Sequence, residues 1–180
     1  MVRRLLMVAA CLVLSACETP TTQRYAISAD NNQSIKALGT TGIGLSTFTG
    51  PATFNSTCRA LGPLQVADGM THTAYIRKAF EDELKVAGAF AQSTARVTLG
   101  ANIDRLEFST TRGLTGGSWS IDMTMKSSNG RTLQISEYYE FDSGFVANEA
   151  CRNTADAYSR SVQNLVGKAV RSAGFPLLIQ

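Results

Sequence analysis

The sequence predicts an α+β fold: a two-layer α/β sandwich with a mostly antiparallel four-stranded sheet and two helices on one face, in the order β-α-β-β-β-α. Two observations predict it. Each expected strand alternates apolar and polar residues, so that only one face of it is buried. Each of the two expected helices carries a single apolar stripe, which must pack on the one apolar face of the sheet.

The first half of the domain is expected to supply one strand and one helix. Apolar residues alternate with smaller ones over residues 41–48, which is typical of a strand. Residues 71–87 carry an apolar stripe at helical spacing, and Gly88 follows as a stop signal. Either Asp68 or Thr71 is placed to cap the start of this helix.

Three strands should follow. Inward-facing residues change from odd to even numbers within residues 97–108, which predicts a β-bulge near Asp104–Arg105. Strict alternation over residues 119–126 then predicts a half-buried strand that turns Trp119 inward. The polar side chains of that strand, Asp122 among them, should point away from the helices.

The last third should contain a hairpin and a long helix. Asn129-Gly130 predicts a two-residue turn of type I′, in which both residues need positive φ. In the strand that follows, Tyr138 should extend the polar face, whereas Glu137 lies on the inward parity and should be near an edge or paired. Residues 148–172 carry an apolar stripe and predict a helix, with Asn148 as its cap.

The first 17 residues have the pattern of a bacterial lipoprotein signal. Arg3 and Arg4 precede an uncharged apolar run, and Leu14-Ser15-Ala16-Cys17 matches the lipobox at every position. We expect residues 1–16 to be removed, the Cys17 sulfur to carry diacylglycerol, and its amino group to carry a further acyl chain such as palmitate. The alternative is an ordinary secretory signal with a chance cysteine.

The rest of the chain should then comprise a lipidated, flexible tether and one domain. Residues 17–34 are polar and lack an apolar period, whereas residues 35–180 contain all the expected elements. In the best-known sorting rule an aspartate after the lipidated cysteine retains a lipoprotein in the inner membrane, so Glu18 favours the outer membrane. We therefore expect a lipid-anchored protein that faces the periplasm.

The charge balance argues against a nucleic-acid partner. The chain has 17 basic and 14 acidic residues, and loss of Arg3 and Arg4 with the signal leaves a formal charge of +1. Such a balance gives no electrostatic footprint for binding nucleic acid.

The remaining cysteines predict a disulfide. Cys11 belongs to the signal and Cys17 to the lipid, which leaves Cys58 and Cys151 as a pair in an exported protein. Two separately buried thiols are the alternative. A metal site is not expected, because His72 is the single histidine and no Cys-x-x-Cys spacing exists.

Residues 39–173 resemble the YajG-type lipoproteins of bacterial envelopes. The resemblance rests on the lipobox, the helix that ends in Leu84-Lys85-Val86-Ala87-Gly88, the strand from Trp119 to Met125, the Asn129-Gly130 hairpin and the segment from Tyr139 to Phe145. More loosely, the chain resembles other small α/β lipoproteins, including auxiliary lipoproteins of ABC lipid-transport systems and the lipopolysaccharide-assembly lipoprotein. The resemblance implies no catalytic constellation.

Two groups of residues have the types that a catalytic site would need. A Ser-His-Asp arrangement would need His72 with Asp68 or Asp82, but a lone histidine in a first helical turn is more often a solvated polar residue. Asp104 and Glu107 could form a carboxylate site, yet the predicted bulge explains their parity without any chemistry.

These observations favour a non-catalytic envelope lipoprotein, an accessory or binding component in the transport or assembly of envelope material. It would need no cofactor and no metal, would bind the membrane through its lipid, and would have an envelope protein or lipid as partner. The expected partner surface is the polar sheet face around Asp122 and Tyr138. The alternative is a periplasmic hydrolase or inhibitor module with a site on its loops.

Overall fold

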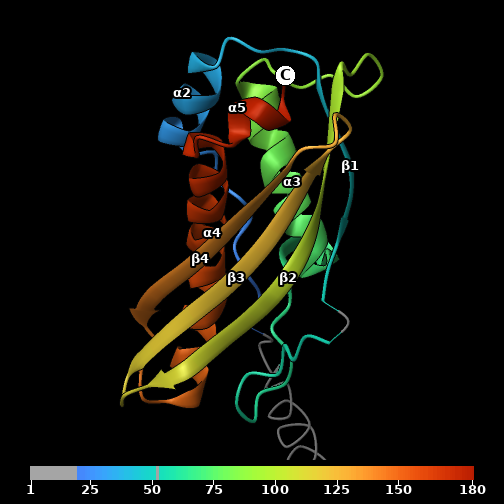
Figure 1. The fold of residues 1–180 in the computed structure, drawn as a ribbon. Helices are drawn as coiled ribbons and strands as arrows, with labels where there is room; N and C mark the ends of the chain where they lie inside the picture. Colours follow the sequence, from blue (N-terminus) through green and yellow to red (C-terminus); the bar gives the residue numbers. More distant parts are fainter. Residues whose placement is uncertain (1–19, 52) are drawn as a thin grey trace, which may run out of the picture.

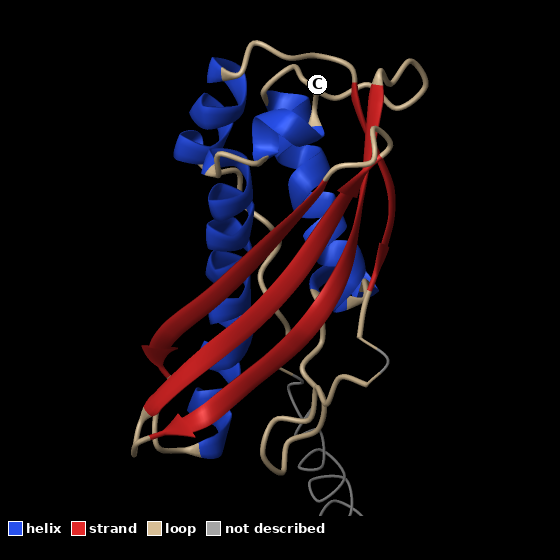
Figure 2. Cartoon of the chain, in the orientation of Figure 1, coloured by secondary structure: helices blue, strands red, loops and turns tan. Residues whose placement is uncertain are grey.

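The computed structural model describes residues 20–180 apart from residue 52, so the expected signal peptide and Cys17 lie outside the described residues. One sheet forms one layer, and the helices gather against one of its faces (Figures 1 and 2). This arrangement confirms the predicted α+β fold. Within the described part of the chain, no helix is both long and apolar enough to span a bilayer.

The sheet has four strands in the order β1-β2-β3-β4. β1 (Ile43–Thr49) pairs in parallel with β2 (Val97–Arg112), and the α3 crossover between them allows this direction. β3 (Gly116–Ser127) and β4 (Thr132–Asp142) continue as antiparallel neighbours. Only β1 and β4 are therefore edge strands.

The predicted bulge in β2 is confirmed. Ile103 pairs with Met123 and Arg105 pairs with Asp122, so Asp104 is the extra residue between two paired positions. The bulge lets both halves of the strand bury their apolar side chains, since Ile103 and Leu106 are at most 4% exposed.

Two long helices cover the inner face of the sheet. α3 (His72–Val86) begins where predicted, and Thr71 is its N-cap, accepting a hydrogen bond from the Ala74 amide at 3.1 Å. α4 (Ala147–Arg171) packs along β3 and β4. The prediction that Asn148 caps α4 was wrong. The helix begins at Ala147, and its N-cap residue is Val146, whose side chain makes no capping hydrogen bond.

The hairpin between β3 and β4 differs from the predicted type I′ turn. Gly130 has a φ of +85°, but Asn129 is not among the residues with positive φ. The Gly130 amide donates to the Ser127 carbonyl at 3.0 Å, and the Ser127 amide donates to Arg131 at 2.9 Å. The connection is therefore a three-residue loop with glycine in the left-handed position. The Asn129 side-chain amide instead donates to the carbonyls of Leu177 and Leu178 in the short helix α5 (Phe175–Leu178) and to that of Gln180 after it.

The segment expected to be a tether is packed on the domain from Pro20 onward. The Gln65 amide donates to the Pro20 carbonyl, and α2 (Ala29–Ala37) follows with Ser28 as its N-cap. Glu83 of α3 is fully buried and holds this segment, accepting from the Tyr25 hydroxyl at 2.7 Å and from the Ser28 amide at 2.8 Å. The expectation of a flexible tether over residues 17–34 is corrected for residues 20–34. Hydrogen bonds, rather than an apolar stripe, hold these residues against the domain.

Candidate functional site

The outer face of the sheet carries no covering helix (Figures 1 and 2). On β3, Trp119, Ile121, Met123 and Met125 are buried towards the helices, so the intervening polar side chains lie on this outer face. Ser120 pairs with Tyr138 and Asp122 pairs with Ser136, which places Asp122 and Tyr138 close together on adjoining strands. Tyr138 is 53% exposed.

Two close ion pairs lie on this face. The Arg105 Nε lies 2.7 Å from an Asp122 carboxylate oxygen, and this hydrogen bond holds the pKa of Asp122 below its ordinary value. Arg112 of β2 and Glu140 of β4 form a second pair across β3 at 2.8 Å. The outer face is therefore polar, and two of its cations are neutralised by neighbouring carboxylates.

Asp104 and Glu107 line one cleft of about 520 Å³, but their carboxylates have separate partners. Asp104 accepts hydrogen bonds from Asn102 and Thr124, each at 2.6 Å. A carboxylate oxygen of Glu107 instead lies 3.9 Å from a guanidinium nitrogen of Arg105. Each carboxylate thus has its own partner, and the bulge is explained by the change of buried parity along β2.

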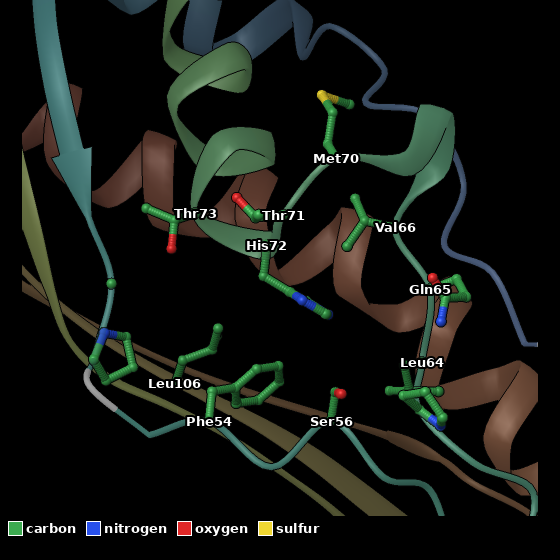
Figure 3. A pocket seen from close by; sticks show the side chains of 13 residues that line it. Phe54, Ser56, Leu64, Gln65, Val66, Met70, Thr71, His72, Thr73 and Leu106 are labelled. Atoms are coloured by element: carbon green, nitrogen blue, oxygen red, sulfur yellow. The ribbon is translucent and has the colours of Figure 1, made fainter.

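The second candidate location is a cleft at the start of α3, with a volume of about 290 Å³. Figure 3 shows the His72 ring between the α3 backbone and the side chains of Phe54, Leu106 and Val66. The His72 ring centroid lies 4.7 Å from that of Phe54 and 5.1 Å from that of Tyr158. The expectation of a solvated histidine was wrong, because the rings of Phe54, Tyr158 and Trp119 have their centroids within 6.2 Å of its own.

This environment makes His72 a poor general base. Burial lowers its pKa to about 4, and its buried Nε2 has no hydrogen-bond partner among the described residues. Asp68 is paired with Arg24 at 2.6 Å, and Asp82 is paired with Lys78 at 2.7 Å, so neither carboxylate orients the imidazole. Among the described residues, no cluster of three or more His, Cys, Asp or Glu side chains could hold a metal ion.

Cys58 and Cys151 are joined by a disulfide, with 5.8 Å between their Cα atoms. The bond links the long connection before α3 to the second turn of α4. Both cysteines are fully buried.

Glu137, expected to be paired or near an edge, is 2% exposed and forms an ion pair with Lys168 of α4 at 2.7 Å.

Sequence reasoning missed Arg59. Its guanidinium donates to the carbonyls of Thr110 at 2.9 Å and Phe145 at 2.8 Å, and its backbone has a φ of +48°. One side chain thus connects three separate segments. The only available signal was its place beside Cys58, because the partners lie far away in the sequence.

Comparison with known proteins identifies the fold only. No family model matches the chain, and no curated relative matches it. A solved structure of a Xanthomonas campestris protein of the family model DUF330 is similar with a TM-score of 0.52 and 15% identity, covering 89% of this chain and 93% of that one. A Caulobacter crescentus CB15 protein named "a putative lipoprotein" has a TM-score of 0.48 and 12% identity, covering 79% and 90% of the two chains.

Proposed function

We propose that this chain is a bacterial envelope lipoprotein that acts by binding, as an accessory component in the transport or assembly of envelope material. The observation that carries the proposal is the uncovered outer face of the sheet around Asp122 and Tyr138. The lipobox at Cys17 supports the address, and so does the name of the Caulobacter crescentus protein. Glu18 favours the outer membrane.

The outer face has the features of a partner surface. Tyr138 is a large amphipathic side chain left half in water, and tyrosine is enriched among residues that dominate binding energy. β4 is an edge strand, so a partner could also add a strand there through backbone hydrogen bonds. A partner would be an envelope protein or an envelope lipid held by surface contact.

The anchor is tested by replacing its sulfur. Cys17→Ser should abolish lipid attachment and removal of the signal, because no other group there offers the nucleophile. Mass spectrometry of the mature amino terminus checks the acylation, and membrane fractionation checks the address. An unacylated mature start, or a serine variant that still fractionates with membranes, would contradict the proposal.

The surface is tested by photo-crosslinking in living cells. A photoreactive residue at position 138 should give a discrete crosslinked product, and Asp122→Asn should reduce its yield. Val86 of α3 is 54% exposed and lies off the sheet, so the same photoreactive residue at position 86 is the matched control. Equal products at both positions, or none at position 138, would place the binding surface elsewhere.

A second candidate, a periplasmic hydrolase or inhibitor module, is favoured by one observation: the cleft beside His72. His72→Gln would remove any role for the imidazole in a loop-borne site. Loss of a hydrolytic or inhibitory activity in that variant, with folding unchanged by circular dichroism, would favour this candidate over a binding component.

A further inference from the structure

One end of the molecule exposes large apolar side chains from three separate connections. They are referred to here as the apolar tip: Leu61, Leu114, Phe145 and Val146, which are 39%, 83%, 75% and 62% exposed. Leu114 lies between β2 and β3, and Phe145 and Val146 lie between β4 and α4. Figure 1 shows these connections at the lower end of the molecule, opposite α5.

The three connections are held together as a unit. Arg59 donates to Thr110 of β2 and to the carbonyls of Gly144 and Phe145. The Thr115 carbonyl accepts from the Ser143 amide at 2.7 Å. The disulfide fixes Cys58, beside Arg59, to α4. The tip is therefore a preorganised surface, and its side chains stay in water without a covering partner in the described structure.

The chain enters the domain at the same end. Thr21 and Gln65 form a parallel bridge, so Pro20 lies on the side towards which the chain runs back from Gln65 to Leu61. Cys17 lies only three residues before Pro20, whose carbonyl accepts from Gln65. Three residues span at most about 11 Å, so a lipid on Cys17 holds this end of the domain at the bilayer surface.

We propose that the apolar tip docks into the interfacial region of the bilayer beside the lipid anchor. The inference rests on the lipidation of Cys17 in the proposed function and adds which part of the domain contacts lipid. A short connection brings the four side chains to the membrane, where burying their apolar surface is favourable. β2, β3 and β4 run between the tip and the opposite end (Figure 2), so the outer sheet face remains open to the periplasm.

The experiment measures contact of single positions with lipid. Leu114→Trp and Phe145→Trp place tryptophan in the tip, and Leu177→Trp is the matched control, since Leu177 is 47% exposed on α5 at the opposite end. Each lipidated variant is reconstituted in phosphatidylethanolamine–phosphatidylglycerol vesicles with or without brominated acyl chains. The signal of the fully buried Trp119 is subtracted by using the unsubstituted protein.

We expect brominated lipid to quench the two tip tryptophans several-fold more than the tryptophan at position 177, with a blue shift for the tip positions only. Equal quenching at all three positions would overturn the docking. A second arm holds a mature Cys17→Ser chain on nickel-chelating lipid through an amino-terminal histidine tag. If the tip tryptophans are selectively quenched in this second arm but the first arm shows no acylation of Cys17, the lipid anchor is refuted and the docking is supported. If the second arm shows no selective quenching of the tip tryptophans, the docking is overturned.

Discussion

At the scale of single residues, burial decides the chemistry of the groups that look functional. His72 lies among aromatic rings, and its Nε2 has no partner to compensate for a charge. A protonated imidazole would be poorly solvated there, so the ring remains neutral at physiological pH. His72 therefore packs beside Trp119 and Tyr158 as an uncharged ring.

His72 should make folding stability depend on pH. Its pKa is about 4 in the folded chain and near the ordinary 6.5 when unfolded, so the unfolded chain takes up the proton first as the pH falls. The stability contributed by the neutral ring is complete above pH 6.5 and is lost progressively towards pH 4, by up to about 3 kcal/mol. His72→Phe should reduce the dependence of the unfolding free energy on pH between pH 6.5 and pH 4, measured by urea unfolding at a series of pH values. The same pH dependence in the variant and the natural chain would contradict the lowered pKa of His72.

The hydrogen bond from Tyr25 to Glu83 should hold the amino-terminal segment in place. Tyr25→Phe leaves the buried carboxylate one donor short and should cost about 1.5–3 kcal/mol of unfolding free energy. Tyr139→Phe is the matched control, because no hydrogen bond joins the Tyr139 hydroxyl to another described residue and its ring packs against Phe141. Similar midpoints for both variants in urea unfolding would show that the bond contributes little.

At the scale of elements, the connection between β1 and α3 shows how an irregular segment becomes ordered. It lacks a long helix or strand, yet it contains Cys58, Arg59 and the pairing of Thr57 with Pro63. The disulfide and the Arg59 hydrogen bonds attach it to α4 and to β2. Covalent and polar links thus act together with the burial of Leu64 and Val66, which are 3% and 4% exposed.

The disulfide should contribute strongly to stability. Its cysteines are 93 residues apart, and the loop-entropy model gives roughly 4–5 kcal/mol for a loop of that size. The Cys58→Ala, Cys151→Ala double variant should therefore melt at a clearly lower temperature, and reductant should lower the melting temperature of the natural chain but not that of the variant. Quantitative alkylation of both cysteines without reductant would rule the bond out.

At the scale of the whole molecule, the two faces of the sheet differ in what covers them. The inner face forms one core with α3 and α4, whereas the outer face presents neutralised charge pairs to solvent. The apolar tip closes one end of the same layers. In our two proposals, this single small domain meets a membrane at its end and a partner on its side.

The folded domain should begin near residue 20 rather than near residue 35. Limited proteolysis of the mature chain should remove only the first few residues, because Pro20, Thr22 and Tyr25 are hydrogen-bonded to the domain. Mass spectrometry of the resistant fragment gives its first residue. A resistant fragment that starts near residue 35 would restore the long tether.

The sequence by itself determined the features that depend on local spacing. Alternation over residues 97–108 and 119–126 located two strands and the bulge at Asp104, and helical spacing with Thr71 located α3. Periodicity reports which face of an element is buried, so these predictions needed no knowledge of distant residues. The same parity placed Asp122 and Tyr138 on the outer face.

Only the tertiary structure decided the features that depend on residues far apart in the chain. Glu83 meets Tyr25 across 58 positions, His72 meets Tyr158 across 86, and Arg59 reaches Phe145 across 86. A polar residue in the sequence looks the same whether its partner is water or a distant side chain. Burial of α2, the lowered pKa of His72 and the assembly of the apolar tip follow from that three-dimensional placement, which spacing along the chain does not encode.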